Sequence, residues 1–327
     1  MKEKGLNMNK LHLKGIVLVI SGAILWGVSG TVAQFLFQHN NFTVEWLVVI
    51  RLLLSGVLLL GYSLLKKDRG VKEIWKNKKD AITLLSFGVL GMLGSQYTYF
   101  AAIKYGNAAT ATILQYLSPV IITCYVVACS KKLPEKSQLI AISLAILGTF
   151  FIITKGDINS LSISKEALFW GLCSAASGAL YTLQSANLLK KYSVITIAGW
   201  GMLIGGIAFS FINPPWEFSG TWSVATVSAV GFVVIFGTLF AYYCYLESLN
   251  YIQPTETSIL CAFEPVSAAF LSVIWLKNHF SMGDFIGTAC IITTTVILAY
   301  SKKDNTEKVC EDDEKDTCKH VDKGREL

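Results

Sequence analysis

A succession of long apolar segments, from about Ile16 to Tyr300, limits the fold of this chain more than any other feature. An α-helix of about 20 residues crosses the roughly 30 Å hydrocarbon core of a bilayer. Transmembrane β-strands are about ten residues long and alternate in polarity, and these segments do neither. The sequence therefore predicts an all-α membrane protein. Its ten predicted transmembrane helices cover residues 16–37, 46–65, 81–103, 108–129, 137–154, 167–187, 194–212, 223–246, 255–276 and 282–300.

The amount of charge agrees with a membrane protein. Of the 327 residues, 53% are hydrophobic and 15% are charged, whereas a soluble domain carries about 25% charged residues. The first apolar run, 16–37, is longer than the core of a signal peptide, about 7–15 residues, and lacks a small-residue cleavage site. We therefore expect this run to be retained as the first helix.

Lys and Arg residues predict the orientation, because they collect in the cytoplasmic loops of membrane proteins. With the N-terminus inside, 23 of the 28 lie in inner segments, four lie in outer loops, and Arg51 lies within a span. We therefore expect both termini in the cytoplasm of a bacterium, with 1–15 as an N-terminal segment and 301–327 as a disordered tail. The predicted inner loop Glu247–Pro254 carries no Lys or Arg and fits this rule least well.

An internal repeat is visible when the sequence is shifted by 146 residues. Chance similarity between apolar helices is the alternative, but the order of matches without gaps favours a true repeat. The predicted repeats are 16–154 and 167–300. Each contains five helices, an odd number, so the second must be inverted, as in many secondary transporters. The shift places Tyr97, Tyr99, Tyr105, Ile113, Leu114, Pro119 and Val120 on Tyr243, Tyr245, Tyr251, Ile259, Leu260, Pro265 and Val266.

Two prolines in matching spans predict broken helices at a central binding site. Pro265 follows Glu264, and a carboxylate in mid-span costs about 2.5–3.5 kcal/mol on insertion scales, so it usually faces a cavity or a partner. Pro119 is its counterpart and frees the carbonyl of Gln115. The alternative is that both prolines only kink packed helices around a protonated Glu264. We expect Glu264 to bind a substrate ammonium group or to carry a coupling proton, and Gln115 to be a second candidate.

Further polar and aromatic side chains within the spans are candidates for the same site. Hydrocarbon offers them no hydrogen-bond partner, so we expect them to face a cavity. Of the paired tyrosines, alternate residues of a helix cannot both face it. Arg51 lies near the outer end of its span, where it either snorkels to the interface or meets an anionic group or Glu264. The predicted substrate-binding residues are Trp26, Gln34, Tyr97, Gln115, Tyr181, Gln184, Tyr243 and Glu264.

Several function classes lack their sequence signals. The chain contains no G-x-x-x-x-G-K-[ST] phosphate loop and no H-E-x-x-H metalloprotease motif. We expect no cofactor and no metal ion. The basic clusters match the anionic cytoplasmic leaflet of the lipid bilayer, so nucleic acid is not an expected partner. A passive channel and an intramembrane enzyme remain as alternatives to a carrier, although no nucleophile–base pair supports the enzyme.

These residues resemble the drug/metabolite transporter superfamily, in particular its EamA-like family. The shared features, over about residues 12–301, are Trp26–Gly27, an early Arg51, L-S-P-V at Leu117–Val120 and F-E-P-V at Phe263–Val266. Relatives commonly end spans four and nine with Gly-Glu, which is absent here. The resemblance implies ATP-independent transport of a small metabolite, often outward, with amino acids prominent. The expected function is therefore a plasma-membrane carrier for an amino acid or related compound.

Overall fold

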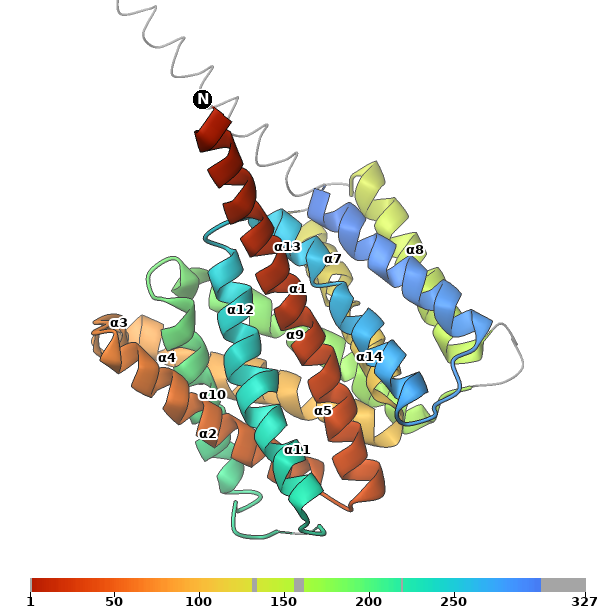
Figure 1. Cartoon of the computed structure of the whole chain (residues 1–327), viewed down its shortest axis with the longest axis horizontal. Helices are drawn as coiled ribbons and strands as arrows, with labels where there is room; N and C mark the ends of the chain where they lie inside the picture. The colour runs from red at the N-terminus through yellow and green to blue at the C-terminus, as the bar shows by residue number, and fades with distance from the viewer. Residues whose placement is uncertain (1, 131–133, 156–161, 219, 301–327) are drawn as a thin grey trace, which may run out of the picture.

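The computed structural model of this chain describes residues 2–130, 134–155, 162–218 and 220–300. Over these ranges the chain forms helices and no strand, which confirms the predicted all-α class (Figure 1). The predicted tail 301–327 lies outside the described residues. The predicted ends agree to one residue at 137–154, where the structure has a helix over Lys136–Thr154, but the helix predicted over 16–37 begins much earlier, at Lys2.

The helices of the first half follow one another with short connections. Two features interrupt them. A π-helix separates α4 from α5, and two non-helical residues separate α6 from α7. The helices are α1 (Lys2–His39), α2 (Val44–Leu65), α3 (Gly70–Glu73), α4 (Lys78–Ser86), the π-helix η1 (Phe87–Leu93), α5 (Gly94–Tyr105), α6 (Ala108–Gln115), α7 (Ser118–Ser130) and α8 (Lys136–Thr154).

The second half contains the same two kinds of interruption. A π-helix lies between α11 and α12, and two residues separate α13 from α14. A final helix, Met282–Tyr300, is drawn in dark blue beside α8 in Figure 1. The preceding helices are α9 (Lys165–Leu189), α10 (Val194–Ser210), α11 (Val224–Val234), the π-helix η2 (Ile235–Phe240), α12 (Ala241–Ser248), α13 (Pro254–Leu260) and α14 (Phe263–Ile274).

Six helical stretches in the described part of the chain are long and apolar enough to cross a membrane. Two more apolar helices, α10 and α14, are shorter. The first helix begins at Lys2, so the predicted N-terminal segment 1–15 continues into α1 as helix from residue 2 onward. The six stretches are Leu11–His39, Val44–Leu65, Ala108–Cys129, Lys136–Thr154, Val224–Ser248 and Met282–Tyr300.

Glycines let the first helix lie close to both of its neighbours, α12 and α14 (Figure 1). A Cβ atom at Gly22 would lie 2.9 Å from the carbonyl oxygen of Ala241 in α12. At Gly27, a Cβ would lie 2.9 Å from the backbone nitrogen of Ala268 and would also meet the carbonyl of Glu264. Membrane helices that approach this closely need small residues at the contact. Gly27 therefore sets the distance between α1 and the helix that carries Glu264.

Hydrogen bonds join the loops at the end of the bundle where α2 finishes. The carboxylate of Asp68 accepts from the hydroxyls of Ser193 at 2.6 Å and Thr196 at 2.8 Å. Asp80 pairs with Lys191 at 3.0 Å and accepts from the hydroxyl of Tyr192 at 2.9 Å. These contacts fasten the segment after α2 to the segment before α10.

The loop Glu247–Pro254, which has no positive charge of its own, receives a cation, Lys14, from α1. The ammonium group of Lys14 donates to the hydroxyl of Tyr251 at 2.8 Å, and that hydroxyl donates to Glu247 at 2.9 Å. His12 lies 3.1 Å from the carboxylate of Glu256. The positive charge at this loop is therefore supplied in space by another segment.

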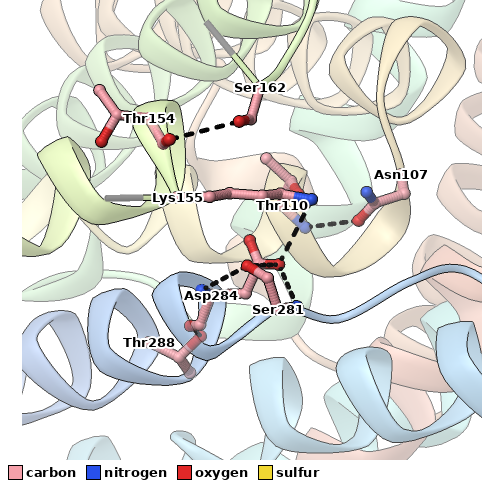
Figure 2. A network of polar contacts seen from close by, with 8 residues as sticks. All are labelled: Asn107, Thr110, Thr154, Lys155, Ser162, Ser281, Asp284 and Thr288. Carbon is pink, nitrogen blue, oxygen red and sulfur yellow. Dashed lines mark hydrogen bonds and ion pairs between the residues drawn. The ribbon is translucent and has the colours of Figure 1, made fainter. Parts of the chain in front are cut away.

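A second polar network lies at the opposite end, near the end of α1 (Figure 2). Lys155, at the end of α8, lies 3.7 Å from the carboxylate of Asp284. The same carboxylate accepts from the backbone and hydroxyl of Ser281 at 2.7 and 2.9 Å, which caps the final helix. Nearby, Asn107 caps α6 by accepting from the backbone of Thr110 at 2.8 Å. These contacts tie the final helix to α8.

Candidate functional site

A cavity of about 1220 Å³ lies among the helices and is walled by both halves of the chain. Ligand pockets are typically about 300–1,000 Å³, mostly apolar, with a few polar groups that fix orientation. Within the described residues, no group of three or more His, Cys, Asp or Glu side chains could hold a metal ion. The polar and aromatic lining includes Trp26, Ser29, Arg51, Gln96, Tyr99, Gln115, Tyr116, Ser118, Tyr181, Tyr242, Tyr245, Cys261 and Glu264.

Two helix breaks meet at this cavity. The first separates α6 from α7 at Tyr116 and Leu117, and the second separates α13 from α14 at Cys261 and Ala262. The hydroxyl of Tyr116 donates to the carbonyl oxygen of Cys261 at 2.6 Å. In a continuous helix this carbonyl would accept from the residue four positions later, which is Pro265 and has no N–H. Because that N–H is missing, the carbonyl of Cys261 can accept from Tyr116, which lies at the other break.

Glu264 lies beside this contact, in the first turn of α14. Its Oε2 accepts from the hydroxyl of Tyr116 at 3.3 Å, and its backbone N–H donates to the carbonyl of Cys261 at 2.9 Å. A carboxylate in the first turn is favoured by the partial positive charge of the helix N-terminus. No ion pair within the described ranges includes Glu264. Its carboxylate therefore lines the cavity with a hydrogen bond from Tyr116 and with the charge of Arg51 at a longer distance.

Arg51 does not reach towards the membrane surface. Its side chain is 6% exposed and lines the cavity. Nε donates to the hydroxyl of Thr238 at 2.8 Å, and Nη2 donates to the carbonyl of Gly237 at 3.1 Å, both in η2. The guanidinium also lies over the ring of Phe100, with its central carbon 5.1 Å from the ring centroid. Of the two interpretations of Arg51, the inward one fits this position.

Aromatic side chains surround the space between these two charged residues. The ring of Trp26 packs against Tyr242 and Tyr245, with centroids 5.4 and 5.5 Å apart. Tyr99 is 8% exposed, and its hydroxyl lies 2.9 Å from that of Thr112. Aromatic faces attract cations, and their edges and hydroxyls donate hydrogen bonds. The cavity can therefore hold a small molecule that has both charged and apolar parts.

The structure brings some predicted residues together and leaves others outside the lining. The lining includes Trp26, Arg51, Gln115, Pro119, Tyr181 and Glu264, and it does not include Gln34, Tyr97, Gln184, Tyr243 or Pro265.

The outlying residues have contacts of their own. Gln34 is 1% exposed and accepts from the backbone of Ala108 at 2.9 Å, so it caps α6. The hydroxyl of Tyr97 donates to Glu45 at 3.1 Å. Gln184 donates to the hydroxyl of Ser86 at 3.1 Å, and Tyr243 is 50% exposed. These side chains support helix packing around the cavity or face away from it.

Sequence reasoning missed several lining residues. Tyr116 is the most important, and its position next to Gln115 before the L-S-P-V motif was a usable signal. Tyr242 and Tyr245 are three residues apart and so share one helix face, which the pairing of Tyr243 with Tyr97 obscured. Ser29 and Gln96 carried no signal that separates them from other polar residues in the spans.

Comparisons with known proteins identify the family of this chain. A family model for the EamA-like transporter family matches residues 13–154 and again residues 165–300. The chain is 36% identical over 293 residues to an uncharacterized inner membrane transporter, YicL, of Salmonella typhimurium, covering 89% of this chain and 96% of that protein. It is 28% identical to an uncharacterized transporter, YetK, of Bacillus subtilis, covering 78% of each.

One solved crystal structure is similar in fold. It has a TM-score of 0.53 and 16% sequence identity, and the match covers 89% of this chain and 96% of that chain. This likeness concerns the fold alone. The two matches of the family model and the 36% identity with a transporter cover most of the chain. This chain therefore belongs to the EamA-like transporter family, and it is a multi-pass membrane protein.

Proposed function

We propose that this protein is a secondary transporter that moves an amino acid or related small metabolite outward across the bacterial plasma membrane. In this proposal the chain crosses the bilayer ten times. Two inverted five-helix repeats, 16–154 and 167–300, expose the cavity alternately to either side. Both termini lie in the cytoplasm.

The contact between Tyr116 and Cys261 is the observation that carries the proposal. Each residue lies at the break of a discontinuous helix, one in each half, and the two breaks meet at the wall of one cavity. Discontinuous helices from two repeats, facing one central site, are typical of secondary transporters with inverted repeats.

Two further observations support the repeat. The family model matches the two halves separately, over residues 13–154 and 165–300. Shifting the π-helix η1 by the 146 residues that align the two halves places it on residues 233–239, which overlap η2 (Ile235–Phe240). π-Helices are rare and concentrate at functional sites, so their occurrence at matching positions is not expected from apolar composition alone.

The lining of the cavity supports an amino acid or a related compound as the substrate. Glu264 offers a carboxylate for a substrate ammonium group, and Trp26, Tyr242 and Tyr245 offer aromatic faces beside it. In a proton-coupled carrier, the same carboxylate takes up a proton from the solution on one side and releases it to the other, in alternation with the substrate ammonium group. The relative YicL is named an inner membrane transporter, which supports the bacterial plasma membrane as the location.

Counterflow in proteoliposomes tests this function. Vesicles that contain the purified protein are loaded with one unlabelled amino acid and diluted into a trace of the labelled form, across a panel of amino acids. A carrier accumulates label transiently above equilibrium, whereas a channel gives linear flux without accumulation. We expect Glu264→Gln to abolish counterflow or its pH dependence. The control Glu166→Gln, which removes an exposed carboxylate outside the cavity, should leave both intact.

If Glu264→Gln transports at the same rate with the same pH dependence, Glu264 has no part in the mechanism. If no amino acid shows counterflow while flux rises linearly with concentration, the protein is a pore.

A further inference from the structure

We propose that Arg51 is the binding site for a carboxylate group of the substrate. The cavity then has an anion-binding pole at Arg51 and an acidic pole at Glu264. This inference rests on the proposed carrier function, since it concerns the ligand of the same cavity, and it adds a chemical requirement that the function alone does not contain.

The first argument is the unused hydrogen-bonding capacity of Arg51. A guanidinium has five N–H donors in a fixed planar fork. In the described part of the chain, one N–H on Nε and one on Nη2 have protein acceptors, and Nη1 has none. The remaining donors belong to a side chain that is 94% buried yet lines the cavity. A planar, bidentate oxyanion such as a carboxylate is the acceptor that this fork fits best.

The second argument is charge. Among the ion pairs of the described residues, none includes Arg51, and Glu264 acts on it only from beyond ion-pair distance. A buried cation without a counter-ion in contact is costly, because its lost hydration is replaced mainly by neutral acceptors. Here the acceptors are a carbonyl, a hydroxyl and the face of Phe100. A bound carboxylate would supply a negative charge in direct contact with the guanidinium.

The third argument is rigidity. The contacts of Arg51 with Gly237 and Thr238 fix its guanidinium against η2, across from its own helix α2. η2 can lie close to α1 because Gly237 lacks a side chain; a Cβ there would overlap Ser29 of α1. A charged group that is held in place before the ligand arrives loses little conformational entropy on binding. The fork is therefore held on η2 by two hydrogen bonds and lies over the ring of Phe100 in α5.

The two poles are close enough for one small molecule. Both side chains line the same cavity, and each acts electrostatically on the other. Among the described residues no ion pair joins them, so their charged groups are near but not in contact. A molecule with an ammonium and a carboxylate group a few bonds apart spans this separation.

The alternative is that Arg51 only clamps α2 to η2. The two roles make different predictions for a pair of variants. Arg51→Gln removes both the charge and the clamp. Thr238→Val removes one clamp contact with little change in shape and leaves the charge in the cavity.

The test is the binding of matched acids and amides to purified full-length protein. The probes are L-phenylalanine, L-leucine and L-methionine, each compared with its primary carboxamide, and binding is measured by the rise in melting temperature with concentration. A charged hydrogen-bonded pair predicts that the wild-type protein binds the best acid roughly ten- to a hundredfold more tightly than its amide. Arg51→Gln should reduce this ratio to about one, whereas Thr238→Val should keep it within about threefold of wild type.

The inference is overturned if the wild-type protein binds amides as tightly as acids, or if none of the three acids binds. It is also overturned if Arg51→Gln keeps the preference, or if both variants change it equally. The comparison in the wild-type protein decides the question even where Arg51→Gln does not fold. Acids that bind without counterflow would refute the carrier and leave the carboxylate site standing. Counterflow of amides without a preference for acids would support the carrier and refute the carboxylate site.

Discussion

The hydroxyl of Tyr116 lies 2.6 Å from the carbonyl oxygen of Cys261 and joins the broken helices of the two halves at the wall of the cavity. Both partners of this hydrogen bond depend on a break in their helix. The carbonyl is available because Pro265 has no N–H, and the tyrosine reaches it because α6 ends one residue earlier, at Gln115. The proline in the sequence thus produces the helix break, and the break produces a contact between the two halves at the cavity.

Removing this bond should weaken the contact between the halves. In Tyr116→Phe the carbonyl of Cys261 keeps the N–H of Glu264 as its remaining donor, so we expect a loss of only about 1 kcal/mol in folding free energy. The rate of counterflow should fall clearly even though the folding free energy changes little, because the phenol also contacts Glu264. The control is Tyr243→Phe, which removes a hydroxyl from a half-exposed tyrosine outside the lining. Equal effects of the two variants on counterflow would contradict a role for Tyr116 at the site.

Gly27 should tolerate no side chain. A Cβ at this position would overlap Ser267 and meet the backbone of Glu264 and Ala268, so Gly27→Ala must push α1 away from α14. Overpacking of this kind costs about 1–3 kcal/mol. Gly61 of α2 is the matched control, because nothing lies within 4 Å of a Cβ there. Gly61→Ala should be neutral or stabilise by up to about 1 kcal/mol. Thermal unfolding of the two purified variants decides, and equal melting temperatures would contradict the close packing.

The loop contacts of Asp68 predict an acid-dependent loss of stability. The hydrogen bond from Ser193, followed by those from Thr196, Gly70 and Ser63, lowers the pKa of Asp68 below its ordinary value of 3.8. A depressed pKa means that the stabilisation is complete above the unfolded pKa, near pH 4, and is lost as the pH falls through the folded pKa. The gap in melting temperature between wild type and Asp68→Ala should therefore be constant above about pH 5 and shrink below pH 3.8.

Melting curves from pH 3 to 7 measure this gap. Glu73→Ala, which removes an exposed carboxylate from the neighbouring helix α3, serves as the control and should show no such gap at any pH. A gap between wild type and Asp68→Ala that stays constant down to pH 3, or widens there, would contradict the proposed hydrogen-bonded carboxylate.

The inverted arrangement predicts opposite locations for two exposed positions. In a background without the eight native cysteines, a cysteine is placed at Lys76, before α4, or at Glu166, in the first turn of α9. A membrane-impermeant thiol reagent should label Lys76→Cys only from the cytoplasm and Glu166→Cys only from outside. Labelling of both positions from one side would refute the inverted repeats.

Helix positions followed from the sequence because apolar length is a direct requirement of the bilayer. The predicted 194–212 and the observed α10, Val194–Ser210, differ only by Phe211 and Ile212, two apolar residues that form a turn after the helix. The direction in which the Arg51 side chain points could not be predicted from the sequence, because a snorkelling arginine and an inward-facing one have the same sequence pattern. The sequence also does not reveal the cation at the loop Glu247–Pro254, because Lys14 and Tyr251 are 237 residues apart.

Two things limited the prediction of which side chains line the cavity: the rotation of each helix about its axis, and the position of each residue along that axis. The sequence favours Tyr97 and Tyr243 over Tyr99 and Tyr245, whereas the latter two line the cavity, and all four follow a π-helix, η1 or η2. A π turn adds a residue and rotates every later side chain around the axis. Gln34 shares the face of Trp26, yet it lies eight residues and so about 12 Å further along α1, beside the start of α6.

Alternating access to the cavity is the central claim, and the thiol chemistry of one residue tests it directly. Ser118 lines the cavity in the first turn of α7, and Ser118→Cys in the cysteine-free background places a single thiol there. The account predicts that an impermeant reagent labels this thiol in both right-side-out and inside-out vesicles, and that a transported amino acid slows both reactions. Labelling from one side only, unchanged by any substrate, would contradict it.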